Sequence, residues 1–202
     1  MVIKRCFDIV ASLFGLILFS PVMLTAAFMI RLSMGSPVYF RQQRPGYKGI
    51  PFQLVKFRTM KPVCLDGFND QSDEVRLTKM GRFLRRTSLD ELPEFWNVLK
   101  GEMSIVGPRP LLMDYLSRYS SEQARRHDVK PGITGWAQVN GRNAITWEER
   151  FKLDVWYVDN RSFFLDMKIL WMTLAKVFLQ EGISADQCAT MTEFKGSEQK
   201  RR

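Results

Sequence analysis

Two adjacent carboxylates, Asp90 and Glu91, are the residues of this 202-residue chain best suited to chemistry. An arginine-rich cluster that includes Arg85 precedes them, and Arg109 follows them. A carboxylate can attack a phosphoryl group and hold it covalently, while its neighbour binds a metal ion or handles protons. The arginines would neutralise the phosphates of a substrate. A purely structural interpretation stays open, because acidic residues near a helix start also stabilise the helix dipole.

The residues around this pair predict a short helix that ends at Gly101. Two starting points compete for it. Ser88 and Glu91 have the spacing of a capping box, whereas Pro93 favours the first helical position. We favour the second start, because a proline further into the helix would remove a backbone hydrogen bond. Both alternatives place Asp90 near the positive end of a helix.

Two loops carry further candidate phosphate ligands. In Gly107-Pro-Arg-Pro the two prolines restrict the backbone and thereby determine where Arg109 points. A glycine-rich stretch that starts at Pro131 ends at Arg142. An isolated arginine is more often a surface cation, but a rigid arginine near a carboxylate pair favours a phosphate site.

The remaining elements are predicted from periodicity and capping. Thr146 and Glu149 form a second capping box. His127 lies in a charged run, which predicts a surface or ion-paired histidine. The last helix is so apolar that it belongs in a core or at a membrane interface. The patterns predict helices over residues 73–86, 111–126, 146–161 and 163–180, and strands over residues 37–40 and 52–57.

An apolar run from Cys6 to Ile30 is broken near its middle by Ser20-Pro21. About 20 apolar residues suffice to span a membrane, but Pro21 leaves the carbonyl of Ile17 without its helical partner. Basic residues flank the run at both ends, and both ends therefore favour the cytoplasmic side. Two half-helices of roughly 18 Å each suit one leaflet. On this stretch alone, a kinked spanning helix and a re-entrant helix are equally good interpretations.

Composition and charge narrow the classes of molecule that the protein could bind. The net charge is +9, and no Asp or Glu occurs between Ile9 and Leu65. A basic band beside a membrane segment favours anionic headgroups or a phosphorylated substrate, whereas nucleic acid would explain the charge but not the apolar run. Three widely spaced cysteines and one histidine predict neither disulfides nor a structural zinc site, and they fit a reducing compartment. No Walker-type or GxGxxG phosphate loop occurs.

Five segments along nearly the whole chain resemble the small monotopic phosphoglycosyl transferases, a group of bacterial sugar transferases. Five motifs in the same order are far more specific than any one of them. The segments are Lys4-Arg-x-x-Asp8 with Ser20-Pro21, Phe40-Arg-Gln-Gln-Arg-Pro-Gly46, Lys56-Phe-Arg-Thr-Met60, Ser88-Leu-Asp-Glu-Leu-Pro93 through Gly107-Pro-Arg-Pro110, and Lys130-Pro-Gly-Ile-Thr-Gly135 to Asn143.

The resemblance implies a reaction. Family members transfer a sugar-1-phosphate from a UDP-sugar to a polyprenol phosphate, here expected to be undecaprenyl phosphate, and release UMP. They work by a ping-pong mechanism with Mg²⁺ and a covalent phosphosugar on the aspartate. Carried over, Asp90 is the nucleophile and a Mg²⁺ ligand, and Glu91 is its dyad partner. The positions that match phosphate ligands of the family are Lys56, Arg85, Arg109 and Arg142.

The resemblance also implies an α+β, mostly helical, monotopic membrane protein on the cytoplasmic face of the bacterial inner membrane. Residues 1–34 would form a re-entrant helix with its break at Ser20-Pro21. Residues 35–190 would form a catalytic domain at the interface, with a small β-hairpin and interfacial amphipathic helices, and residues 191–202 a flexible tail. Membrane lipids are then partners and nucleic acid is not.

Two other hypotheses make different predictions. A membrane-tethered protein that recruits anionic lipid or nucleic acid would depend on neither Asp90 nor Mg²⁺. A polyprenyl-diphosphate hydrolase would release inorganic phosphate in place of UMP. The sugar stays open between plain hexoses, N-acetylhexosamines and diamino sugars, with the small form of the chain favouring N-acetylated sugars. The motifs specify no oligomeric state.

Overall fold

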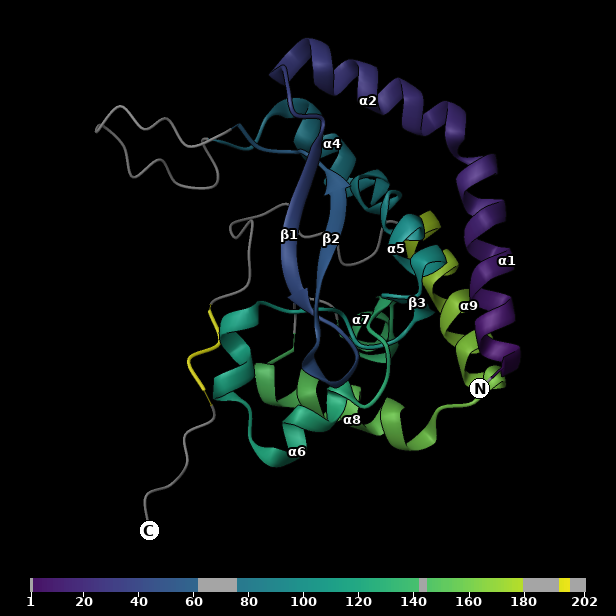
Figure 1. The fold of residues 1–202 in the computed structure, drawn as a ribbon, viewed down its shortest axis with the longest axis vertical. Helices are drawn as coiled ribbons and strands as arrows, with labels where there is room; N and C mark the ends of the chain where they lie inside the picture. Colours follow the sequence, from purple (N-terminus) through teal and green to yellow (C-terminus); the bar gives the residue numbers. More distant parts are fainter. Residues whose placement is uncertain (1, 62–75, 142–144, 180–192, 197–202) are drawn as a thin grey trace.

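The computed structural model describes residues 2–61, 76–141, 145–179 and 193–196. It is mostly helical with a small antiparallel hairpin. Two N-terminal helices form an arc along one side, the hairpin runs through the middle, and a short helix lies between the two (Figure 1). The helices are α1 Val2–Leu18, α2 Ser20–Met34, α4 Lys79–Arg86, α5 Glu94–Lys100, α6 Ser121–Ala124, α7 Trp136–Asn140, α8 Trp147–Asn160 and α9 Phe163–Leu179. The strands are β1 Tyr39–Pro45, β2 Pro51–Phe57, β3 Ser104–Val106 and β4 Gly132–Thr134, and the 3₁₀ turns are η1 Tyr47–Gly49, η2 Leu89–Glu91, η3 Met113–Arg118 and η4 Arg125–His127.

The apolar N-terminal run is broken where the sequence predicts a break. Helices α1 and α2 meet at Phe19 with a bend of 59°. The Ser20 hydroxyl donates a hydrogen bond to the Ile17 carbonyl at 2.8 Å, and this bond replaces the one that Pro21 cannot donate. No single helix among the described residues has the length and apolarity to cross a membrane, although α1 and α2 together meet that test by length and composition.

The Lys4-Arg-x-x-Asp8 motif attaches α1 to the rest of the protein. Arg5 donates hydrogen bonds to the carbonyls of Val98 and Leu99, at 2.7 and 2.8 Å, where they complete the C-terminal end of α5. The buried Asp8 accepts a hydrogen bond from the Ile105 N–H in β3 at 3.1 Å. The first turns of α1 are therefore held against the helix that follows the Asp90-Glu91 pair.

The β1–β2 hairpin separates two sides of the molecule. Its antiparallel register pairs Phe40 with Lys56 and Arg44 with Phe52. Because side chains alternate along a strand, Arg44 and Lys56 point to one face, whereas Arg41 points to the other. Strand β1 begins at Tyr39, two residues later than the predicted strand over residues 37–40, and it continues beyond that prediction to Pro45.

The predicted helix over residues 73–86 is interrupted: Arg76 is helical, Leu77 and Thr78 are not, and α4 spans Lys79–Arg86. Residues 73–75 lie outside the described residues. Leu77 forms an isolated β-bridge instead of a helical turn. The Thr78 side chain then caps α4 by accepting a hydrogen bond from a backbone N–H of its first turn. A local β-bridge and a good N-cap residue thus interrupt the helix that apolar periodicity predicts as continuous.

The prediction of one helix over residues 111–126 is wrong, because the segment divides into η3, α6 and η4. Leu112 and Tyr119 have extended backbone, with ψ of 150° and 141°, and this conformation interrupts helical hydrogen bonding. Ser120 then starts α6 with a capping box to Gln123. The apolar periodicity reflects packing against α8 and not one continuous helix.

A parallel pair of short strands, β3 and β4, supports the loop that carries Arg109. The sequence suggested only loops here. The backbones approach so closely that a Cβ atom on Gly107 would lie 2.4 Å from the Lys130 carbonyl oxygen, and one on Gly132 would lie 2.1 Å from the Gly107 nitrogen. These glycines therefore allow two backbone segments to pair, and that pairing holds the loop.

The C-terminal helices follow their predictions closely. The capping box of Thr146 and Glu149 forms at the start of α8. Helix α9 is mixed in character, since Ile169 is fully buried in the core while Phe164 and Trp171 are 84% and 74% exposed. Within the stretch that was expected to be a tail, the described residue Phe194 is buried against Phe151.

Candidate active site

Asp90 and Glu91 lie in the 3₁₀ turn η2, immediately ahead of α5. Helix α5 begins at Glu94, one residue after the preferred start at Pro93, which is its N-cap, and it ends at Gly101 in the left-handed conformation. The alternative capping box does not form, because Ser88 itself has a positive φ of 57° and makes no side-chain cap. This turn brings the Glu91 carboxylate against the hairpin residue Lys56 and the loop residue Arg109.

Glu91 is neutralised by two cations from different elements. Lys56 Nζ lies 2.7 Å from Glu91 Oε1, and both terminal nitrogens of Arg109 donate to the same carboxylate. Burial opposes the charged form of Glu91, but the charges of Arg109 and Lys56 outweigh burial and hold its pKa well below its ordinary value. Glu91 is therefore ionised throughout the physiological range, and it orients both cations.

Glu94 is a third carboxylate of the site that the sequence analysis missed. It is 1% exposed, and Lys56 Nζ lies 2.9 Å from its Oε1. Burial raises the pKa of Glu94 to about 7. The signal that could have found it is its spacing, since residues three apart on a helix face the same side, and Glu91 and Glu94 meet the same lysine.

Asp90 differs from both glutamates because none of the described residues forms a hydrogen bond or ion pair with its carboxylate. Its side chain is nevertheless largely buried, and the residue is 8% exposed. Burial and the nearby charge of Glu91 raise the pKa of Asp90 to about 6, against the opposing charges of Lys56, Arg109 and Arg85. Above about pH 6, Asp90 is therefore an ionised carboxylate whose oxygens no described residue occupies, as a nucleophile requires.

Of the two remaining predicted phosphate ligands, the structure describes Arg85 but not Arg142. Arg85 reaches the site from α4, where its Nε donates to the Thr59 hydroxyl at 3.0 Å, and its charge acts on Asp90. Arg142 lies outside the described residues. Lys56, Arg85 and Arg109 thus come together around Asp90 from a strand, a helix and a loop that are far apart in the sequence.

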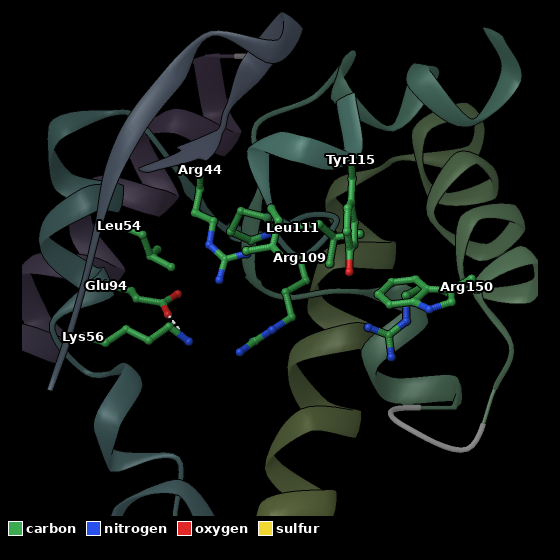
Figure 2. Close-up of a pocket in the computed structure, with 11 residues that line it drawn as sticks. Arg44, Leu54, Lys56, Glu94, Arg109, Leu111, Tyr115 and Arg150 are labelled. Atoms are coloured by element: carbon green, nitrogen blue, oxygen red, sulfur yellow. Dashed lines mark ion pairs between the residues drawn. The ribbon is translucent and has the colours of Figure 1, made fainter. Parts of the chain in front are cut away.

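A cavity of about 310 Å³ adjoins this cluster. In Figure 2 the cationic ends of Arg44, Lys56 and Arg109 point toward the same space, and Arg150 faces them from the other side. Only one carboxylate, Glu94, lines it among the described residues. Its remaining lining residues are Leu54, Pro110, Leu111, Leu112, Tyr115 and Trp147.

His127 corrects another expectation, because it is not at the surface. It is 9% exposed, and its ring lies beside that of Tyr119 with centroids 5.6 Å apart. Burial and the charge of Arg126 lower the pKa of His127 to about 4. The histidine is therefore neutral at physiological pH and belongs to the packing beneath the site.

The part of the chain that the structure describes holds no group of three or more His, Cys, Asp or Glu side chains suited to a metal ion. Mg²⁺ rarely needs such a group, since it is usually bound by one or two carboxylates, substrate phosphates and water. The oxygens of Glu91 are occupied by Lys56 and Arg109, whereas those of Asp90 contact no cation among the described residues. The residues present therefore fit a Mg²⁺ ion that is shared between Asp90 and a phosphorylated substrate.

Comparison with known proteins identifies the class to which this fold and site belong. The chain matches the bacterial sugar transferase family over residues 1–180 and belongs to that family. This finding confirms the resemblance drawn from the five motifs. This chain is 58% identical over 197 residues to the uncharacterized sugar transferase EpsL of Bacillus subtilis, and the match covers 98% of each chain.

Larger proteins with named activities are also similar. The chain is 44% identical over 191 residues to a UDP-glucose:undecaprenyl-phosphate glucose-1-phosphate transferase of Klebsiella pneumoniae, covering 90% of this chain and 41% of that protein. It is 41% identical over 196 residues to galactosyl transferase CpsE of Streptococcus agalactiae, covering 90% of this chain and 43% of that protein. The chain thus spans about two fifths of the length of these relatives.

Proposed function

We propose that this protein transfers a sugar-1-phosphate from a UDP-sugar to a polyprenol phosphate, most simply undecaprenyl phosphate, and releases UMP. The names of the larger relatives support this reaction. It would be the first membrane step in the assembly of a glycoconjugate. The observation that carries the proposal is the contrast between Glu91, whose oxygens are occupied by Lys56 and Arg109, and Asp90, whose oxygens no described residue occupies.

In the proposed first step, an Asp90 carboxylate oxygen attacks the phosphorus atom that bears the sugar. The bond from that phosphorus to the bridging oxygen breaks, and the oxygen leaves with UMP. In the second step, an oxygen of the polyprenol phosphate attacks the same phosphorus, and the bond to Asp90 breaks. The products are a polyprenol diphosphate sugar and the regenerated carboxylate. This ping-pong sequence lets a water-soluble donor and a lipid acceptor use one site in turn.

The neighbouring residues stabilise charge. Glu91 keeps Lys56 and Arg109 in place, and these cations together with Arg85 would bind the oxygens of the transferred phosphate. Arg142 is proposed as a further phosphate ligand on the basis of the sequence alone. Mg²⁺, when bound at Asp90 with the substrate, would neutralise part of the diphosphate charge.

We further propose that α1 and α2 enter the cytoplasmic leaflet of the bacterial inner membrane and return to the same side. Two observations support this re-entrant arrangement: the 59° bend at Phe19 and the exposed apolar side chains along both helices. Arg5 and Asp8 hold α1 against α5 and β3, and the depth of the helix pair would therefore set the height of Asp90 at the interface. Exposed aromatic residues on α9, Phe164 and Trp171, would lie on the same lipid surface.

The decisive experiment compares Asp90→Asn with the wild type in nanodiscs that contain undecaprenyl phosphate. UMP release from a panel of UDP-sugars should fall by at least about 10³-fold, because the nucleophile is lost. Without acceptor, intact-mass measurement should find one sugar-phosphate adduct on the wild type and none on Asp90→Asn. The exposed Asp114→Asn variant is the matched control and should behave as the wild type.

Two results would contradict the proposal. Unchanged UMP release by Asp90→Asn would exclude the covalent mechanism. Release of inorganic phosphate from a polyprenyl diphosphate, with no UMP from any UDP-sugar, would indicate a hydrolase instead of a transferase.

A further inference from the structure

The two faces of the β1–β2 hairpin border two different spaces. Arg44, Leu54 and Lys56 line the cationic cavity of about 310 Å³ described above. The opposite face carries Arg41 and Val55, which line a wider hollow of about 830 Å³. Leu16 and Met23 of the bent helix pair complete that hollow. The cationic cavity therefore lies on the hairpin face that points away from the N-terminal helices.

Arg44 lines the same cavity without an ion-pair partner among the described residues, although the charge of the buried Glu94 acts on it. Lys56 and Arg109 are neutralised by Glu91 and Glu94, as shown above. No described carboxylate forms an ion pair with Arg44, whose Nη2 donates to Gln42 Oε1 at 2.6 Å and whose buried Nε has no hydrogen-bond partner. Burial lowers the pKa of Arg44, and the charge of Arg109 lowers it further. A half-buried guanidinium in this state fits an anionic ligand.

The other lining residues specify the kind of anion. Leu111, Leu112 and Tyr115 give the cavity an apolar side, which a bare phosphate would not need. A volume of about 310 Å³ is at the lower end of the range for small-molecule pockets, about 300–1,000 Å³. It suits a compact organic phosphate and is far too small for a polyprenyl chain. Arg109 lines the cavity and also contacts Glu91, so that it joins the cavity to the Asp90 site.

We propose that this cavity holds the nucleoside monophosphate half of the donor, and that Arg44 binds the phosphate that leaves as UMP. The inference rests on the proposed function. When the bond between the sugar-bearing phosphorus and the bridging oxygen breaks, that oxygen stays on the nucleotide phosphate, whose negative charge increases. Arg44 stabilises this leaving group, while Arg109 lies between the two phosphates.

The test compares Arg44→Gln with Arg41→Gln, which makes the same change on the opposite face of the same strand. Arg44→Gln should weaken UMP binding, measured by equilibrium dialysis, and raise the KM for the UDP-sugar, each by about 10- to 100-fold. Arg41→Gln should change neither by more than about twofold. Transfer from phosphosugar-loaded enzyme to undecaprenyl phosphate should keep its wild-type rate in Arg44→Gln, because UMP has already left.

Each result of this comparison decides a separate point. Wild-type UMP binding by Arg44→Gln would overturn the inference and leave the Asp90 mechanism intact. An equal loss in the second half-reaction would mean that Arg44 serves the lipid phosphate, which also overturns it. Absence of UMP release by the wild type would refute the proposed function itself, whereas UMP binding would still report on the cavity. Arg44→Lys, which keeps the charge, replaces Arg44→Gln if circular dichroism shows that the glutamine variant is unfolded, and should bind UMP more weakly than the wild type.

Discussion

Two buried ionic clusters lie side by side in this protein, and they are organised in opposite ways. In the first, Arg126 is 2% exposed and donates to Asp154 Oδ2 through Nε at 3.1 Å and through Nη2 at 2.7 Å. Its Nη1 reaches the Tyr119 hydroxyl at 3.2 Å. In the second, around Asp90, one carboxylate lacks a partner among the described residues and the adjoining cavity has excess positive charge.

The difference separates a cluster that supports the fold from one that is prepared for a substrate. Buried charges are tolerated when they are paired and hydrogen-bonded. Arg126 meets that condition, whereas Asp90 and Arg44 have no ion-pair partner among the described residues. The two clusters are also connected, because Arg126 Nη2 donates to the backbone carbonyl of Arg109 at 2.8 Å. The Arg126–Asp154 ion pair thus holds the loop from which Arg109 reaches Glu91.

The largest effect on stability is expected from Arg126→Met. This variant leaves Asp154 buried without its ion-pair partner, which typically costs about 3–5 kcal/mol of unfolding free energy. Thermal unfolding in detergent should show a large decrease in melting temperature, with loss of activity through displacement of Arg109. Arg125→Met, in the exposed neighbouring residue, is the matched control and should leave the melting temperature nearly unchanged. Equal effects of the two variants would refute the contrast.

Asp90→Asn, in contrast, is expected to stabilise the fold. The pKa of Asp90 is raised to about 6 from an ordinary value near 3.8, and ionisation of Asp90 therefore opposes folding above pH 6. Removing that charge should raise the melting temperature at pH 8 by about 2–4 °C, the shift that 1 kcal/mol produces. The gain should shrink as the pH falls from 6 toward 4. A decrease in melting temperature at pH 8 would show that Asp90 is a structural charge.

A smaller shift is expected in the pH dependence of the first half-reaction. The rate of UMP release should fall as the pH decreases through about 6, because protonated Asp90 cannot attack. Glu91→Gln should move the midpoint to lower pH, since it removes a negative charge and frees two cations near Asp90. Glu94 titrates near pH 7, and Glu94→Gln therefore serves as the control. If the midpoint disappears in Glu94→Gln, Glu94 and not Asp90 controls the rate.

Much of the fold could be predicted from the sequence. The break at Ser20-Pro21, the start of α5 after Pro93, and the capping box of α8 depend on proline geometry and on local side-chain to backbone bonds, which neighbouring residues specify. The helix over residues 111–126 was predicted wrongly, because Leu112 and Tyr119 adopt extended backbone in response to packing on distant residues. The β3–β4 pair was missed because its strands are too short to show a pattern.

For the candidate site, the sequence by itself determined the chemical types: an Asp-Glu pair, a set of cations and an apolar anchor in a family-specific order. Only the tertiary structure decided which carboxylate the described cations leave unoccupied, because that depends on which cation reaches which oxygen. Lys56 comes from a strand and Arg109 from a loop, and both bind the Glu91 carboxylate. The same is true of Arg44, whose place in the cavity follows from the hairpin register. Charge pairing across long sequence separations is a property of the folded chain, and no local pattern records it.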